Sequence, residues 1–262
     1  MNIIEFENID VGYDEKVVLK NINLKIKSGE HFAILGANGS GKSTLMKLIQ
    51  SQIHPRQTKN FKKEIFGKSR YSIFELKKEL GVITNDLHNY FEKEGGYLSG
   101  FEVVLSGFYS SIGIFTHQDF TKEQIQKAIE VMNFLEIIDL KNKKVSSMST
   151  GQLRKCIVAR ALIHDPKAFV LDEPTVGLDI KAQINFIKLL QKISLKSTII
   201  LVTHHFEEIF PEIKNVALIY NNTIFKIGKK EDILNSENLS TIFDIKIEVK
   251  QKNKRYYIET VL

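Results

Sequence analysis

The chain has 262 residues, of which 43% are hydrophobic and 26% are charged, so it can bury a substantial core within one large domain. This composition excludes disordered and fibrous proteins. The net charge of +6 comes from lysines spread along the chain, without a basic stripe of interleaved aromatics, so we do not expect a nucleic-acid partner.

The sequence carries no sign of secretion or of membrane insertion. Its longest apolar runs, such as STIILV and NVALIY, are far shorter than the ~20 residues that span a bilayer. The N-terminus, MNIIEFENID, lacks the basic and apolar parts of a secretion signal. With one cysteine, Cys156, no intrachain disulfide is possible, and we expect a small buried side chain there. These features predict a cytoplasmic protein.

The first 35 residues predict strands, the last of which leads into a glycine-rich loop. IIEFENIDV and NINLKIK alternate apolar and polar residues, as strands with one buried face do. HFAIL is apolar on both faces, which is typical of a central strand. It leads into GANGSGKST, and LMKLIQSQI then has the spacing of a helix that ends near Pro55.

A mainly helical segment is predicted from Thr84 to Ala161. Its clearest helix lies in TKEQIQKAIEVMNFLEII, where Thr121 and Gln124 form a capping box. Ser149 is expected to cap a later helix that starts in MSTGQLRKC. The apolar residues that share one face of the first helix are Ile125, Ala128, Ile129, Met132 and Leu135.

Strands return near the C-terminus as AFVLD, STIILVTH and NVALIYNNTIFKIG. The last of these predicts a hairpin, because the pair Asn221 and Asn222 tolerates the positive φ of a tight turn. A solvated hairpin turn also explains the basic run KQKNKR at 250–255. We therefore predict one α/β domain over 1–262, with a core and β subdomain in 1–83 and 162–262 and a helical insertion in 84–161.

The segment GANGSGKS at 36–43 fits the phosphate-loop pattern G-x-x-x-x-G-K-[ST], with the required strand before it and helix after it. Its N–H groups and the helix N-terminus would attract phosphate oxygens. Lys42 would bridge the β- and γ-phosphates, and Ser43 would offer its hydroxyl to Mg²⁺. The residues expected to bind the nucleotide are Gly36, Ala37, Asn38, Gly39, Ser40, Gly41, Lys42, Ser43 and Thr44.

The segment AFVLDE at 168–173 supplies an acidic pair at the end of a strand, where ligands of α/β sheets collect. Asp172 would hold Mg²⁺ through its water shell, and Glu173 would polarise an attacking water. An acidic pair at a strand end is commonly only a solvated turn. Together with the phosphate loop, it predicts a hydrolytic nucleotide site.

Five segments, in this order, resemble the motifs of the ABC (ATP-binding cassette) ATPase family: Gly36–Thr44, Ser149–Gln152, Asp172–Glu173, Gly177–Asp179 and His204. The resemblance covers nearly the whole chain. It implies a P-loop NTPase fold with a RecA-like core, an N-terminal antiparallel β subdomain and an inserted helical subdomain. It also implies ATP and Mg²⁺ as cofactors, and a head-to-tail dimer of two cassettes that encloses two ATP molecules.

The same resemblance assigns roles to further residues. His204 would contact the γ-phosphate and share catalysis with Glu173 and Lys42, and Tyr13 would stack on adenine unless it is only a surface turn residue. A metal site at the tandem His204-His205 is the alternative, but no Cys or further His stands at ligand spacing. Across the dimer, the residues that would contact ATP held by the second chain are Ser149, Gly151 and Gln152. Asp179 would help to couple the two nucleotide sites.

The sequence departs from the family pattern at three positions. Asn85 stands where the family has a glutamine that ligates Mg²⁺, and it keeps the amide oxygen on a shorter arm. Met148 replaces a leucine, which is a mild apolar change. Thr150 replaces the first of two glycines and adds a β-branched side chain. One consequence of these changes would be a slower hydrolysis of ATP than the family pattern implies.

The segments SIFELKKELGVITNDL, VVLSGFYSSIGIF and VTHHFEEI resemble importer cassettes of the iron-siderophore, cobalamin and molybdate-associated types. This implies an ATP-hydrolysing subunit that powers import of a metal complex or other small solute without touching the cargo. Its partners would be a second copy and permease subunits at the inner face of the membrane. YLSGFEVVLSGFYSSIGIF would form the permease surface or pack in the core around Phe101, Val104 and Leu105. The alternatives are a soluble ABC ATPase with a regulatory or repair role, and a nucleotide-binding switch without hydrolysis.

Overall fold

The computed structural model describes residues 1–56, 60–115, 117–205, 208–252 and 255–260. Its central layer is a six-stranded sheet in the order β5-β6-β7-β3-β8-β9, in which all neighbours are parallel except β8 and β9. β3 and β7 are buried along their whole length, as their continuous apolar runs predict. The strands are β3 (Phe32–Gly36), β5 (Leu80–Ile83), β6 (Ala168–Asp172), β7 (Thr198–Thr203), β8 (Asn215–Tyr220) and β9 (Thr223–Lys229).

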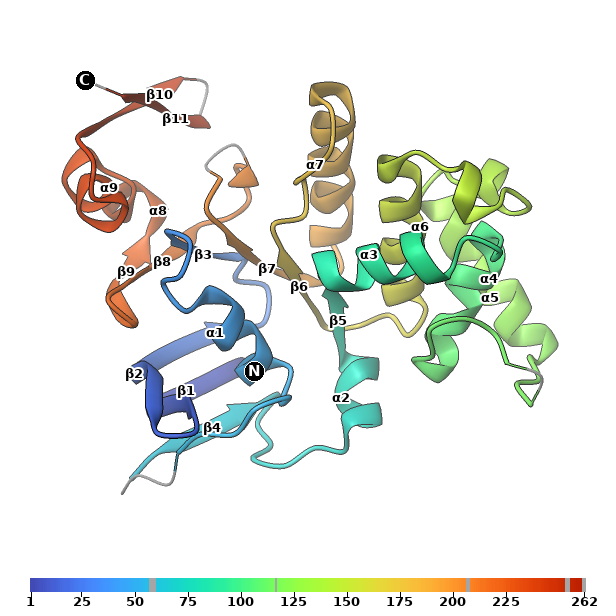
Figure 1. Cartoon of the computed structure of the whole chain (residues 1–262), viewed down its shortest axis with the longest axis horizontal. Coiled ribbons are helices and arrows are strands. Elements are labelled where there is room, and N and C mark those ends of the chain that lie inside the picture. Colours follow the sequence, from blue (N-terminus) through green and yellow to red (C-terminus); the bar gives the residue numbers. More distant parts are fainter. Residues whose placement is uncertain (57–59, 116, 206–207, 253–254, 261–262) are drawn as a thin grey trace.

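A second, antiparallel sheet forms the N-terminal part of the molecule (Figure 1). It pairs β1 (Asn2–Tyr13) with β2 (Lys16–Lys27) and with β4 (Lys62–Ile65). The helix α1 (Lys42–Ile49) shares one buried apolar cluster with both sheets, which includes Phe6 of β1, Ile34 of β3 and Leu45 of α1. Burial alternates along most of β2, as the sequence pattern predicts, whereas register shifts interrupt the alternation in β1, where the neighbours Ile3 and Ile4 are both buried.

Helices make up most of the chain between β5 and β6, and they lie together at the right of Figure 1. The predicted capping box of Thr121 and Gln124 is confirmed. On that helix Met132 and Leu135 are buried, whereas Ile125 at its start is 38% exposed. The α-helices from α2 to α6 are α2 (Ile73–Glu79), α3 (Asn85–Glu94), α4 (Gly100–Leu105), α5 (Lys122–Phe134) and α6 (Thr150–Leu162).

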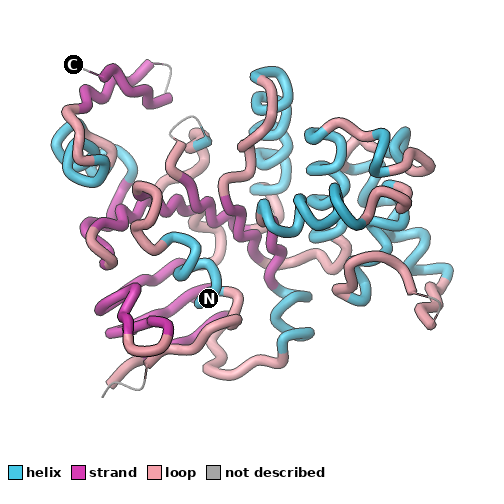
Figure 2. Tube along the Cα trace, viewed as in Figure 1, coloured by secondary structure: helices cyan, strands magenta, loops and turns pink. Residues whose placement is uncertain are grey.

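The C-terminal part adds a hairpin and further helices around the strand-rich half of the molecule (Figure 2). Asn221 and Asn222 have φ of 47° and 66°, which confirms the tight turn between β8 and β9. A second hairpin surrounds KQKNKR as predicted, although its residues 253–254 lie outside the described part of the chain. The elements are α7 (Ile180–Ser194), α8 (Lys230–Ile233), α9 (Ser236–Phe243), β10 (Ile247–Lys252) and β11 (Arg255–Thr260).

The architecture is α/β with an antiparallel β part and helices inserted between β5 and β6, as the sequence predicts. Within the described residues, the structure has no helix whose length and apolar character would suffice to cross a membrane.

Candidate nucleotide site

A cavity of about 360 Å³ opens where β3 ends and α1 begins. Because β3 and β6 are parallel strands separated by β7, their C-terminal ends lie on one edge of the sheet. The predicted phosphate loop and acidic pair are thus brought together. The residues that line the cavity are Val18, Asn38, Gly39, Gly41, Lys42, Ser43, Thr44, Asp172 and Glu173.

Glycine is required at specific places in the loop. Gly39 and Gly41 have φ of 79° and 106°, a left-handed conformation that glycine adopts without strain. At Gly41 a Cβ atom would lie only 2.5 Å from Leu19 Cδ2, and at Gly36 it would lie 2.7 Å from the backbone oxygen of Ile219. The loop can therefore keep its backbone N–H groups at the cavity only with glycine at these positions.

Lys42 is the buried cation of the loop. Its Nζ donates hydrogen bonds to the oxygens of Gly36, at 2.9 Å, and Ala37, at 3.0 Å. Burial lowers the pKa of Lys42, while the charges of Glu173 and Asp172 oppose that shift. Ser43 is exposed at the cavity, and Ser40 Oγ is buried without a hydrogen-bond partner among the described residues. The loop thus places the Lys42 side chain and the exposed Ser43 at the cavity, whereas Ser40 does not line it.

The acidic pair stands at the end of β6. Burial, and then the neighbouring Glu173, raise the pKa of Asp172 to about 6, although Lys42 acts in the opposite direction. Glu173 has a φ of 45°, which a non-glycine residue rarely adopts, and its N–H donates to Val202 O at 2.8 Å. The backbone therefore leaves the extended conformation directly after Asp172, and both acidic residues line the cavity.

Glu173 contacts the predicted histidine. Its Oε1 lies 2.5 Å from His204 Nδ1, and His204 directly follows the end of β7. The carboxylate can only accept, so the Nδ1 atom of the ring is the donor and Nε2 remains for another group. The His205 ring lies against the His204 ring, with 3.9 Å between their centroids. The structure thus joins Glu173 and His204, as expected for residues that act together.

Tyr13 and Asn85 lie outside the residues that line the cavity. Tyr13 is 43% exposed at the end of β1, and its ring centroid lies 5.8 Å from Nζ of Lys47 on α1, so the ring stands beside the helix that starts at the phosphate loop. Asn85 opens α3, and its Oδ1 accepts a hydrogen bond from Arg154 Nη2 at 3.1 Å. The predicted contacts of Tyr13 with adenine and of Asn85 with Mg²⁺ stay predictions.

The Ser149–Gln152 segment starts α6, and the predicted cap is confirmed. Ser149 Oγ accepts from Gln152 N at 3.3 Å, and Gln152 Oε1 accepts from Ser149 N at 3.1 Å. Neither residue lines the cavity described above, and Ser149 is exposed. A Cβ atom added to Gly151 would lie 3.5 Å from that of Ala182, near the start of α7, where Asp179 accepts from Ala182 N at 2.8 Å.

Sequence reasoning missed two buried charged residues beside the site. Arg154 is 4% exposed and donates from Nη1 to Pro174 O at 2.5 Å. Glu208 is 1% exposed, and its Oε1 accepts from Thr175 N and Oγ1 at 2.8 and 2.6 Å. The segment LRKCIVARAL has apolar residues on nearly all sides of its helix, and this pattern could have indicated that Arg154 is buried. Glu208 has no comparable signal in the sequence.

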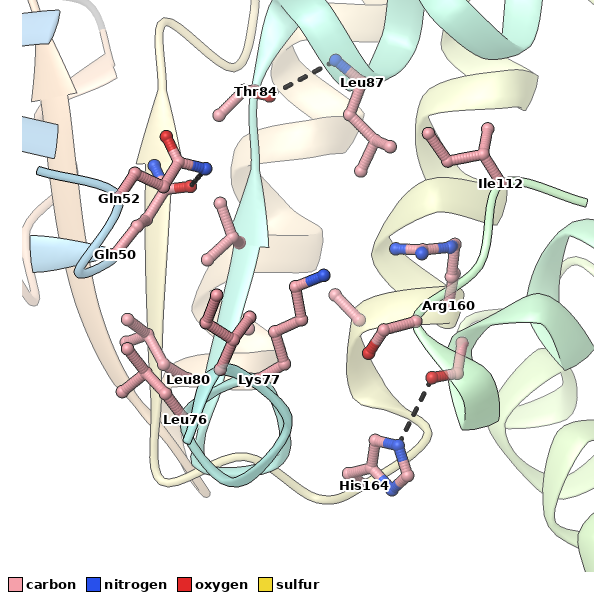
Figure 3. A pocket seen from close by; sticks show the side chains of 16 residues that line it. Gln50, Gln52, Leu76, Lys77, Leu80, Thr84, Leu87, Ile112, Arg160 and His164 are labelled. Atoms are coloured by element: carbon pink, nitrogen blue, oxygen red, sulfur yellow. Dashed lines mark hydrogen bonds between the residues drawn. The ribbon is translucent and has the colours of Figure 1, made fainter. Parts of the chain in front are cut away.

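A second cavity, of about 240 Å³, lies between β5 and α2 on one side and α6 on the other (Figure 3). Arg160, Lys77 and His164 line it, together with apolar residues such as Leu76 and Ile112. Among the described residues that line it there is no carboxylate. Burial lowers the pKa of Arg160 to about 10, and partial burial followed by the charge of Arg160 lowers that of Lys77.

The segment 97–115 divides between this cavity and the core. Val104 and Leu105 are buried and Phe101 is half-buried, as core packing predicts, whereas Ser110 and Ile112 line the second cavity. Core packing is thus confirmed for Val104 and Leu105, whereas the permease surface stays a prediction.

The fold and the first cavity together define an α/β P-loop cassette that binds nucleotide at the C-terminal ends of parallel strands. The family model of the ABC transporter matches residues 19–176. The ABC transporter ATP-binding protein YlmA of Bacillus subtilis strain 168 is 30% identical over 260 residues, which cover 98% of this chain and 96% of YlmA. The chain belongs to the ABC transporter family and is an ABC ATPase cassette.

Solved structures agree with this assignment. The structure of a metal-chelate type ABC transporter in an inward-facing conformation has a TM-score of 0.80 and 25% identity, over 100% of this chain and 97% of that chain. The structure of cbiO1 from Clostridium perfringens, part of the ABC transporter complex cbiONQ, has a TM-score of 0.74 and 27% identity, over 91% and 92% of the two chains. These likenesses confirm the predicted fold class.

Proposed function

We propose that the chain is the ATP-hydrolysing subunit of an ABC importer, and that ATP occupies the cavity at the phosphate loop. The contact between Glu173 and His204 at the edge of that cavity carries the proposal, because it places a general base beside the loop that would hold the γ-phosphate. Lys42 would leave its two backbone acceptors to contact the β- and γ-phosphates, and Tyr13, beside α1, would stack on adenine.

The residues around Asp172 fit Mg²⁺. A hydroxyl group and carboxylate oxygens are ligands that this hard cation prefers. Burial, and then the charge of Glu173, raise the pKa of Asp172, and a bound cation would oppose that shift. Ser43, Asp172 and the amide of Asn85 would hold the ion, Asp172 through water. When bound, Mg²⁺ would neutralise charge on the β- and γ-phosphate oxygens.

Hydrolysis then follows from the arrangement of Glu173 and His204. Glu173 accepts a proton from water as the water oxygen attacks the γ-phosphorus, and the bond to the ADP oxygen breaks. One carboxylate oxygen bonds His204 Nδ1, which leaves the other for the water. His204 Nε2 can then contact the γ-phosphate and keep the water in line. Lys42 stabilises the charge that develops on the phosphate oxygens.

A head-to-tail pair of cassettes would account for the exposure of Ser149 and the partial exposure of Gly151 and Gln152. In such a dimer Ser149, Gly151 and Gln152 would contact ATP held by a second copy, and Asp179 would lie at the same interface. The apolar residues next to Asp179 support this, because Val176 and Ile180 are 38% and 77% exposed in the single chain.

The second cavity fits a segment of a permease subunit. It lies between the core and the helical insertion, its walls carry apolar side chains beside uncharged polar ones, and its charged groups are cationic. Ile73, at its rim on α2, is 59% exposed. A short helix with apolar side chains and one carboxylate would therefore bury its apolar face and pair with Lys77. Docked there, the cassette would lie on the inner face of the membrane and would not touch the cargo.

The nature of the cargo rests on likeness. The solved relatives include a metal-chelate type transporter and a member of the cbiONQ complex. We propose import of a metal complex or another small solute, in which closure on ATP and reopening after hydrolysis drive the permease.

The test is copurification of the tagged protein with detergent-solubilised membranes from its native cells. We expect a polytopic membrane protein to be retained by the wild type and by Lys196→Glu, an exposed position outside the second cavity, and to be lost with Lys77→Glu. A wild-type protein recovered alone would refute the permease role. Strong stimulation of its ATPase by DNA or RNA would favour a soluble ABC ATPase instead.

A further inference from the structure

We propose that Arg154 is a positioning residue for hydrolysis, whose guanidinium group holds Asn85 and the backbone after Glu173 in a fixed relation. The proposal rests on the functions proposed above for Asn85 and Glu173. It adds a residue outside the sequence motifs, and it connects the helix that begins at Ser149 to the hydrolytic site of the same chain.

The geometry of Arg154 carries the proposal. Its Nη1 atom donates to Pro174 O at 2.5 Å and to Glu173 O at 3.4 Å, and its Nη2 atom donates to Asn85 Oδ1 at 3.1 Å. The guanidinium is planar, so these bonds fix the position of the Asn85 amide relative to the loop after β6. Arg154 is 4% exposed, so solvent has little access to these bonds.

The loop after Glu173 is held from a second direction by Glu208. Arg154 binds the oxygens of Glu173 and Pro174, while Glu208 Oε1 accepts from Thr175 N and Oγ1. The charge of Glu208 also opposes the effect of burial, which lowers the pKa of Arg154. The left-handed backbone at Glu173 is therefore followed directly by two residues with buried hydrogen bonds, which limits where the Glu173 carboxylate can point.

This arrangement makes the position of α6 matter for catalysis. Thr150 and Gly151, at the start of α6, lie near Gly177 and Ala182 of the segment after the same loop. Arg154, one turn later, then binds the loop itself. A rotation of α6, imposed by ATP of a second cassette on Ser149 or by a permease at the second cavity, would move the Asn85 amide and the Glu173 backbone together.

The test is a double-mutant cycle on ATP hydrolysis by the full chain. Arg154→Gln should lower kcat by about 10- to 100-fold and change the KM for ATP by less than about threefold, because the phosphate loop is untouched. Arg154→Lys keeps the charge but loses the planar guanidinium with its several donors, so it should recover part of kcat. Arg154→Gln combined with Asn85→Ala should be within about twofold of Arg154→Gln alone, since one change already frees the other residue.

Lys230→Gln is the matched control for loss of a buried cation. Lys230 is also 4% exposed and donates to main-chain oxygens, those of Phe210 and Pro211, which belong to none of the motifs. Lys230→Gln should lower the thermal midpoint, as Arg154→Gln should, but its kcat should stay within about twofold of the wild type. If Arg154→Gln does not fold, the cycle is made with Arg154→Lys.

Two results would overturn the proposal while leaving the catalytic role of Glu173 intact. In the first, the fold-loss of kcat in the double mutant equals the product of the fold-losses in Arg154→Gln and Asn85→Ala. In the second, kcat falls as much in Lys230→Gln as in Arg154→Gln. Turnover that persists in Glu173→Gln is a distinct outcome, because it would refute the catalytic role of Glu173 and the proposal with it.

Discussion

Asp172→Asn is expected to stabilise the protein in the absence of Mg²⁺ and nucleotide. Asparagine has the shape of the protonated aspartate side chain and removes a negative charge that is partly buried beside Glu173. In the wild type, burial and the charge of Glu173 disfavour the ionised form of Asp172 and raise its pKa to about 6. The variant avoids this cost at neutral pH.

The sign and size follow from proton linkage. Between pH about 4 and 6 the native state binds more protons at Asp172 than the unfolded chain does, so wild-type stability falls as the pH rises through that window. The difference between 3.8 and about 6 corresponds to about 3 kcal/mol at 1.36 kcal/mol per pKa unit. Because Asp172 is partly exposed at the cavity, screening by solvent reduces this to about 1–2 kcal/mol.

Thermal unfolding followed by circular dichroism in EDTA measures the effect, since the chain has no tryptophan. The midpoint of Asp172→Asn should exceed that of the wild type by about 2–6 °C at about pH 7.5. The difference should be almost gone at about pH 4. Addition of MgATP should raise the midpoint of the wild type more than that of the variant, because the variant has lost a predicted ligand of the metal.

Glu5→Gln provides a comparison of opposite sign. Hydrogen bonds from Lys25 at 2.9 Å and Asn2 at 2.8 Å, with Lys62 at 3.1 Å, lower the pKa of Glu5 to about 2. This variant should have a lower midpoint than the wild type near neutral pH, and its deficit should shrink only as the pH falls below about 4.5. A lower midpoint for Asp172→Asn at about pH 7.5, or a difference that does not change with pH, would refute the reasoning.

Three further predictions concern the phosphate loop and the core. Lys42→Met should weaken ATP binding at least about tenfold in a fluorescent-nucleotide titration, and unchanged affinity would contradict its role. Gly41→Ala would place Cβ 2.5 Å from Leu19 Cδ2 at a φ of 106°, so urea unfolding should show a loss of about 2–4 kcal/mol, whereas an unchanged midpoint would exclude this clash. Burial raises the pKa of Cys156 to about 12, so Ellman's reagent at about pH 8 should label it only after unfolding, and rapid labelling of the native protein would refute its burial.

The sequence predicts those parts of the fold that depend on local pattern. The continuous apolar run at Phe32–Gly36 becomes a fully buried strand, and the pair Asn221 and Asn222 makes a tight turn with positive φ at both positions. The predicted capping box at Thr121 and the predicted cap at Ser149 also form, because each needs only a side chain and a residue three positions later. The segment Lys62–Ile65 was not predicted as a strand, since four residues with three charges carry no clear period.

For the site, sequence reasoning finds the groups on loops that follow strands and misses those on buried helix faces. Lys42, Asp172 and Glu173 stand in short patterns with a known chemical reason, and the parallel strands bring them to one cavity. The bonds of Arg154 join Asn85 and Pro174, residues far apart in the sequence, so only the folded structure can show them. The second cavity likewise lies between elements whose contact no local pattern encodes.

The position of β7 between β3 and β6 sets the distance between the phosphate loop and the acidic pair. Neighbouring strands lie about 4.8 Å apart, so the strand that delivers the phosphate loop and the strand that delivers the acidic pair are separated by about 10 Å. A nucleotide bound as proposed would extend part of that distance before its terminal phosphate met Glu173 and His204, which follow β6 and β7. In that case the spacing of the strands would favour a triphosphate over its shorter products.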